Sequence, residues 1–189
     1  VRGPKHDYLG MNLDFSEYGT VKIEMTPYIT KIVETFPEKI TGVQSTPAAD
    51  HLFRVRPDNE SRPLPEEQAR AFHHTTAQLL FLSRVRHDIQ TTVAFLTTRV
   101  KRPDEDDWGK LKRVLTYLSS TRHLRLTLSA TSLSNIVWYV DASHQTHDDC
   151  KGHTGAILTF GRGATTSSSS KHKIPSKSST ESEIIGLYD

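Results

Sequence analysis

The 189-residue sequence contains a single cysteine and no long apolar stretch. Cys150 has no second cysteine to pair with, which excludes an internal disulfide and favours a reducing, intracellular setting. The longest apolar runs, 79–82 and 136–140, are far shorter than the roughly 20 residues that a membrane-spanning helix needs. The opening, VRGPKHDYLG, lacks the charged start and apolar core of a signal peptide. We expect no membrane contact, and we interpret a chain that starts without Met as a fragment.

Positive charge is concentrated in the middle third, although the net charge of the whole chain is only +2. Residues 61–130 carry 12 basic and 7 acidic side chains, whereas residues 1–60 carry 7 and 9 and residues 131–189 carry 5 and 6. Clustered Lys and Arg favour a polyanionic partner, because they release counterions from a phosphate backbone. A solvated helix surface would produce the same charge pattern, and charge alone does not separate the two interpretations.

The N-terminal third predicts a hairpin followed by a helix. Residues 8–15 and 20–25 alternate between apolar and polar side chains on either side of the turn sequence SEYG. Thr26 and Pro27 form a helix start, and apolar residues follow at helical spacing until Pro37. Residues 41–65 show no period and several prolines, which is typical of a loop or linker.

The middle of the chain predicts three helices. The first two, at 65–84 and 87–100, follow each other closely enough to form a helical hairpin. The third begins after Pro103 with four acidic residues, which suit the positive end of a helix. Its apolar face contains Trp108, Leu111, Val114, Leu115 and Leu118. Its opposite face contains Lys110, Lys112 and Arg113.

The last third changes to the alternation of strands. Strands are predicted at 123–128, 136–140 and 155–160. Residues 165–180 are rich in Ser, which is compatible with disorder, but we favour a strand and a loop because a helix start follows. The predicted fold class is therefore α+β: a β-hairpin and helix, a helical middle, and a mixed α/β C-terminal part.

Two carboxylates in this last third are candidates for a metal site. Asp141 directly follows the apolar strand 136–140, where an aspartate is also common as a turn residue. Ser178 with Glu181, and Thr180 with Glu183, each have capping-box spacing, so one glutamate can cap the helix while the other projects elsewhere. An aspartate on a strand and a glutamate in the first helical turn would suit Mg²⁺, which prefers oxygen ligands and binds substrate phosphates.

Several segments match the pattern of one known family. They are YLG at 8–10, FHHTTAQLLFLSRVRHDI at 72–89, RP at 102–103, KRVLTYL at 112–118, DA at 141–142, HTG at 153–155 and KSSTESE at 177–183. Over nearly its whole length the chain resembles the C-terminal part of the polymerase polyprotein of copia-type LTR retrotransposons. The middle segments are similar to the family's Y-R-x-x-x-G-x-L-L-Y-L-S-x-x-R-P-D-I and K-R-I-L-R-Y-L motifs.

The resemblance implies three parts: the end of a reverse transcriptase palm (1–45), a linker with a helical thumb or connection-like region (46–122), and the N-terminal half of a ribonuclease H-like domain (123–189). It implies cleavage of the RNA strand of RNA/DNA hybrids with two Mg²⁺ ions, with Mn²⁺ as a substitute. Asp141 and Glu183 would be catalytic metal ligands, and Glu181 would cap the helix. The other implied partners are a template-primer duplex and the remainder of the polyprotein, in a cytoplasmic particle, the nucleus or both.

Two departures from the family pattern limit this activity. The polymerase motif Y-x-D-D is missing, so we do not expect DNA synthesis by this chain. The ribonuclease H domain needs further carboxylates, and Asp189 follows Glu183 too closely to be the next one. The alternative interpretation is a non-catalytic nucleic-acid-binding module or an inactive retroelement remnant.

Two further groups of side chains complete the sequence-based hypotheses. From charge and placement we expect five residues to contact the phosphates of a duplex: Arg84, Arg86, Lys110, Lys112 and Arg113. The recurrence of His144, His147, Cys150 and His153 at every third position superficially offers four zinc ligands. Zinc motifs usually come as two pairs with a longer spacer, so a polar loop is the preferred interpretation.

Overall fold

The computed structural model describes residues 3–57 and 59–188, arranged as two compact units. Among these residues, the first unit comprises 3–52, 56–57 and 59–127, and the second comprises 53–55 and 128–188. Asp189 lies outside the described residues. Within the described part of the chain, no helix is both long and apolar enough to span a bilayer.

The first unit begins with an antiparallel meander of β1 (Lys5–Tyr8), β2 (Met11–Asp14) and β3 (Thr20–Glu24). The predicted hairpin corresponds to β2 and β3. Its first predicted strand is nevertheless wrong at residues 8–10, because Leu9 and Gly10 adopt φ values of 51° and 79° and form a tight turn. Positive φ at both central residues is the geometry of a two-residue hairpin turn.

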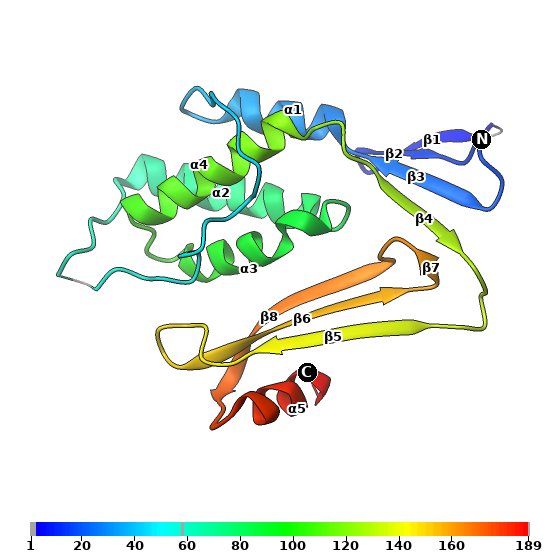
Figure 1. Ribbon diagram of the computed structural model, residues 1–189. Helices are drawn as coiled ribbons and strands as arrows, with labels where there is room; N and C mark the ends of the chain where they lie inside the picture. The colour runs from blue at the N-terminus through cyan, green and yellow to red at the C-terminus, as the bar shows by residue number, and fades with distance from the viewer. Residues whose placement is uncertain (1–2, 58, 189) are drawn as a thin grey trace. The chain divides into compact units, whose positions relative to one another are not determined.

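Five helical segments follow in the first unit (Figure 1). They are α1 (Thr26–Thr35), α2 (Glu66–Leu82), the 3₁₀ turn η1 (His87–Ile89), α3 (Gln90–Arg99) and α4 (Glu105–Ser120). Their apolar faces form a core in which Phe72, Leu79, Leu96, Leu111 and Leu118 have no exposed surface. The four predicted helices are confirmed, since long amphipathic periods are the strongest signal in a sequence.

The start of α4 is stabilised by a reciprocal capping box. The carboxylate of Asp104 accepts a hydrogen bond of 2.9 Å from the backbone N–H of Asp107, and the carboxylate of Asp107 accepts one of 3.1 Å from the N–H of Asp104. The guanidinium of Arg99 donates to Asp107 at 2.9 Å and so connects the end of α3 to this cap. The acidic residues at the start of α4 therefore cap the helix as well as complement its dipole.

The second unit consists of a three-stranded antiparallel sheet and one helix (Figure 1). The strand order is β5 (Val137–Ser143), β6 (Lys151–Thr159) and β8 (Thr166–Pro175), and α5 (Ser179–Tyr188) packs against β5 and β6. The serine run 167–170 pairs with β6, which confirms a strand rather than disorder.

One strand leads from the first unit into the second. The strand β4 (Leu126–Ala130) neighbours β3 in strand order, and its last residues, Ser129 and Ala130, pair with β7 (Gly161–Arg162). The strand begins three residues later than the sequence predicts. The helices, meander and antiparallel sheets together confirm the α+β class.

Candidate carboxylate and nucleic-acid sites

Asp141 lies on β5, which is the edge strand of the three-stranded sheet, and its side chain is exposed. Its backbone pairs with Gly155 of β6, while the next residue, Ala142, pairs with Thr154. Ala142 and Thr154 face α5, so the alternation of a strand directs Asp141 to the opposite face. Within the described residues the Asp141 carboxylate makes no hydrogen bond or ion pair.

Glu183 lies in the first half of α5 and is also exposed. The neighbouring Glu181 caps the helix, as predicted: its N–H donates to the Ser178 hydroxyl at 3.2 Å, and its carboxylate accepts from the backbone N–H of Lys177 at 2.7 Å. In the part of the chain that the structure describes, the Glu183 carboxylate has no hydrogen-bonding or ionic partner. It is therefore free of the capping role that occupies Glu181.

A close backbone approach holds α5 on the sheet. A Cβ atom added to Gly186 would lie 3.0 Å from Cβ of Ala142 and 3.1 Å from Oγ1 of Thr154, so a glycine allows this contact. One turn earlier, the buried Ser182 hydroxyl lies 2.5 Å from the hydroxyl of Ser176. The helix of Glu183 and the strand of Asp141 are thus in direct contact, although the two carboxylates do not bond to each other.

The chemistry of these two side chains fits a hard cation. Each is an exposed carboxylate without a protein cation to neutralise it, and Mg²⁺ is commonly bound through one or two carboxylates together with water and substrate phosphates. Because β5 is an edge strand, a cation beside the edge can be approached from either face of the sheet. Among the described residues there is no group of three or more His, Cys, Asp or Glu placed to hold a metal ion.

The four-residue zinc alternative is wrong, because the structure separates its members. The Nδ1 atom of His144 lies 2.9 Å from the hydroxyl of Ser176, and Cys150 is exposed. The rings of His147 and His153 instead form a buried pair, with Nε2 of the first 3.1 Å from Nδ1 of the second. Burial is the main cause that lowers the pKa of His153 to about 4, and the nearby His147 adds to the effect.

The five basic residues predicted to contact phosphate differ in their surroundings. Arg84 is exposed. Arg86 is only 3% exposed, and its guanidinium donates to Asp88 at 2.9 and 2.6 Å and to the carbonyl and hydroxyl oxygens of Thr121 at 2.9 Å each. This geometry assigns Arg86 a structural role and removes it from the predicted surface.

The three basic residues of α4 also have protein partners. Lys110 is only 8% exposed, which corrects its predicted position on the solvent face; its ammonium group lies 3.0 Å from Asp106. The ammonium group of Lys112 lies 2.5 Å from the carboxylate of Glu38, and Arg113 donates to the hydroxyl of Thr46 at 2.9 Å. Lys112 and Arg113 remain partly exposed, so with Arg84 they are the accessible cations of the five.

The sequence reasoning missed the network around Asp88. Besides Arg86, its carboxylate accepts a hydrogen bond of 2.7 Å from the hydroxyl of Tyr117. Burial raises the pKa of Asp88, but the hydrogen bonds from Arg86 and Tyr117 outweigh it and hold the pKa below its ordinary value. The spacing R-x-D at 86–88 was the available signal, since an Arg two residues before an Asp at a helix start can pair with it.

Comparison with known proteins supplies the deciding observation. The putative transposon Ty5-1 protein YCL074W of Saccharomyces cerevisiae is 29% identical over 187 residues, which is 97% of this chain and 59% of that protein. The retrovirus-related Pol polyprotein from transposon TNT 1-94 of Nicotiana tabacum is 28% identical over 196 residues, which is 99% of this chain and 14% of the polyprotein. The chain is related to transposon Pol polyproteins.

Three further comparisons qualify this relationship. The secreted RxLR effector protein 161 of Plasmopara viticola is 30% identical over 105 residues, which is 55% of this chain and 74% of that protein. No family model matches the chain. No solved structure matches it either. The chain spans 59% and 14% of the two transposon relatives, so the activity of a whole Pol polyprotein is a matter for proposal.

Proposed function

We propose that the chain is part of a copia-type retroelement enzyme that binds RNA/DNA hybrid and, in the complete protein, cleaves the RNA strand by two-metal hydrolysis. The relationship to transposon Pol polyproteins supports the retroelement origin. The observation that carries the chemistry is a pair of exposed carboxylates, without protein partners among the described residues, on two neighbouring elements of one unit, Asp141 on β5 and Glu183 on α5. No polymerase activity is proposed, since Y-x-D-D is absent.

Asp141 and Glu183 would hold Mg²⁺, or Mn²⁺ in its place. A bound pair of such ions supplies an activated water and charge stabilisation at the leaving oxygen. The chain's own contribution is positioning: β5 fixes Asp141 through paired backbone, and the Glu181 cap orders the turn from which Glu183 projects. Two carboxylates leave coordination positions for water and for the phosphate of the RNA strand.

The accessible cations of the first unit would bind the hybrid. Arg84, Lys112 and Arg113 are exposed or half-buried, and contacts from such side chains to phosphate set affinity rather than sequence preference. Binding through them would weaken as salt rises, because each phosphate contact releases counterions. Arg86 and Lys110 are left out of this interface because their charged groups are buried in protein contacts.

The test is cleavage of a labelled RNA/DNA hybrid with Mg²⁺ or Mn²⁺ by a protein that contains this chain within the longer polyprotein. We expect Asp141→Asn and Glu183→Gln each to abolish cleavage while hybrid binding is retained. Glu181→Gln is the matched control, because it changes a carboxylate on the same helix that has the capping role. Cleavage that survives in Asp141→Asn and Glu183→Gln would disprove the assignment.

The alternative is a non-catalytic module or an inactive remnant. One observation favours it: the Plasmopara viticola relative, of which 74% is covered by the match, is named as a secreted effector rather than as a polymerase or nuclease. The same experiment separates the two proposals. Salt-sensitive binding of the hybrid without metal-dependent cleavage by the longer protein would support the alternative.

A further inference from the structure

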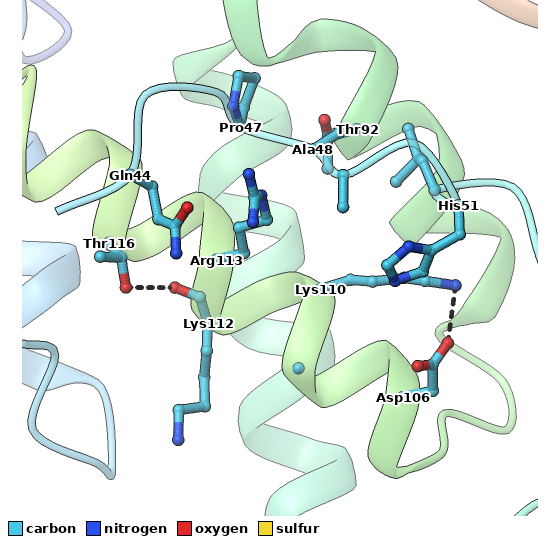
Figure 2. A pocket seen from close by; sticks show the side chains of 13 residues that line it. Gln44, Pro47, Ala48, His51, Thr92, Asp106, Lys110, Lys112, Arg113 and Thr116 are labelled. Carbon is cyan, nitrogen blue, oxygen red and sulfur yellow. Dashed lines mark hydrogen bonds and ion pairs between the residues drawn. The ribbon is translucent and has the colours of Figure 1, made fainter. Parts of the chain in front are cut away.

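A pocket of about 400 Å³ lies in the first unit between the segment 44–52 and α4 (Figure 2). The volume is within the roughly 300–1,000 Å³ that small-molecule sites occupy. Pro47, Ala48 and Leu52 form an apolar wall, while α4 supplies a basic wall with Lys110, Lys112 and Arg113. An apolar wall facing a basic wall suits a ligand with an apolar body and an anionic group.

The three cations of the basic wall are not equivalent. The ammonium group of Lys110 is 3.0 Å from a carboxylate oxygen of Asp106, and that of Lys112 is 2.5 Å from one of Glu38. Both lysines thus already have a carboxylate partner. Arg113 has none within the described residues, where its guanidinium donates to the uncharged hydroxyl of Thr46.

The Nε–H group of Arg113 has no hydrogen-bond acceptor among the described residues, and this is the main observation in favour of a ligand. Its nitrogen is buried and has no hydrogen-bond partner in the part of the chain that is described. Buried polar groups of folded proteins nearly always have a partner, so the Arg113 guanidinium has hydrogen-bonding capacity that its protein contacts leave unused. Figure 2 shows the Arg113 side chain extending from α4 toward Pro47 and Ala48, across the pocket.

We infer that this pocket binds the phosphate group of a nucleotide, with Arg113 as the anion partner and the loop wall in contact with the apolar body. The planar guanidinium fork matches the oxygens of a phosphate, and hydrogen bonds between two charged groups are stronger than neutral ones. The phosphate can belong to a free nucleotide or to the 5′ end of a strand. The inference shares Arg113 with the proposed hybrid interface, but it goes beyond the proposed nuclease because it needs neither Asp141 nor Glu183.

Isothermal titration of the full chain with AMP, adenosine, and a short oligonucleotide with or without a 5′-phosphate tests this inference. We expect AMP to bind and adenosine not to bind, and we expect Arg113→Gln to weaken AMP binding by about tenfold or more, as the loss of a charge-assisted hydrogen bond does. Arg70→Gln, at an exposed arginine of α2 that pairs with Glu66 and does not line the pocket, should bind AMP like the unchanged chain. Preference for the 5′-phosphorylated strand over AMP would identify the strand end as the source of the phosphate.

A second variant keeps the test decisive if Arg113→Gln weakens the fold. Ala48→Trp places a large side chain in the pocket from the loop wall and leaves every charge unchanged, so it should abolish AMP binding with the same thermal unfolding temperature. The inference is overturned if AMP does not bind the unchanged chain, if adenosine binds as tightly as AMP, or if AMP binds Ala48→Trp normally.

Discussion

The hydroxyl of Tyr117 and the guanidinium of Arg86 donate to the same oxygen of Asp88, at 2.7 and 2.6 Å. Tyr117 belongs to α4, and Arg86 and Asp88 belong to the connection between α2 and α3. Arg86 also donates to the backbone carbonyl of Thr121, immediately after α4. One carboxylate therefore joins three helices of the first unit.

Replacing Arg86 by lysine should destabilise the first unit. A lysine cannot reproduce the two-pronged contact with Asp88 or reach Thr121 at the same time. The side chain of Arg86 is 3% exposed and that of Asp88 is 35% exposed, so we expect a cost of about 1–3 kcal/mol. Urea unfolding should show this loss in the free energy of unfolding. The control Arg84→Lys, at an exposed position two residues earlier, should change it by less than about 0.5 kcal/mol. Equal effects of the two substitutions would contradict the structural role of Arg86.

The second unit offers a matched pair of glycines on β6. A Cβ atom at Gly152 would lie 2.2 Å from the carbonyl oxygen of Ser143 and 2.6 Å from the ring of His172, whereas one at Gly155 would meet nothing within 4 Å. We expect Gly152→Ala to destabilise the unit by at least about 2 kcal/mol, since the backbone must move, and Gly155→Ala to be nearly neutral. Amide hydrogen exchange of β5, β6 and β8 measures the difference. A neutral Gly152→Ala would show that β6 does not approach β5 and β8 this closely.

The stability of the second unit should fall as the solution becomes acidic. Burial lowers the pKa of His153 to about 4 from its ordinary 6.5, so between these values the unfolded chain binds a proton that the folded chain does not. The contribution of neutral His153 to the free energy of unfolding is therefore fully present above pH 6.5. It is lost as the pH falls toward 4, and the loss is on the order of 3 kcal/mol. Hydrogen exchange of β6 at pH 7 and pH 5 should show about 2 kcal/mol of this loss.

His153→Asn provides the comparison for the pH experiment, because it removes the titrating ring. It should flatten the pH dependence between pH 7 and pH 5, whereas His123→Asn, at an exposed histidine, should leave it unchanged. The burial explanation fails if the slope in His153→Asn equals that of the unchanged chain.

The capping box of α4 should contribute measurably to stability. Asp104→Ala removes the acceptor for the N–H of Asp107 and also the acceptor for the hydroxyl of Ser61, which lies at 3.0 Å. Loss of a helix N-cap costs about 1–2 kcal/mol. Thermal or urea unfolding should resolve this change, and Glu105→Ala, the exposed next residue, is the control. An identical cost for the two substitutions would argue against the cap.

Long helices were predictable from the sequence, and short turns within alternating segments were not. The apolar face of α4, from Trp108 to Leu118, is buried as predicted. An amphipathic pattern with helical period that continues over sixteen residues is compatible with few other structures. Leu9 and Gly10 escaped prediction because apolar and polar residues alternate on both sides of the turn. The strand β6 begins at Lys151, before the apolar run, because polar residues such as His153 and Thr154 find hydrogen-bond partners inside the unit.

The candidate sites were partly predictable for a related reason. Spacing left Glu181 and Glu183 as equal candidates for the cap, the family resemblance favoured Glu181, and the structure confirms it. The burial of Lys110 did not follow from helical periodicity, since its ammonium group lies 3.0 Å from Asp106 and 4.5 Å from the centroid of the Phe95 ring on α3. The segment 44–52, which the sequence suggests is only a linker, lines the same pocket as Lys110. A segment without a period gives no indication of the helix face against which it packs.

The pocket on α4 has one stiff wall and one compliant wall. The helix wall is fixed by its backbone hydrogen bonds and by a cap, whereas the segment 44–52 contains no helix or strand among its residues. Much of the affinity of any ligand in this pocket is therefore set by the conformational entropy that the loop loses when the ligand holds it in place. Substitutions that stiffen the loop in its present conformation would tighten binding without adding a single contact to the ligand.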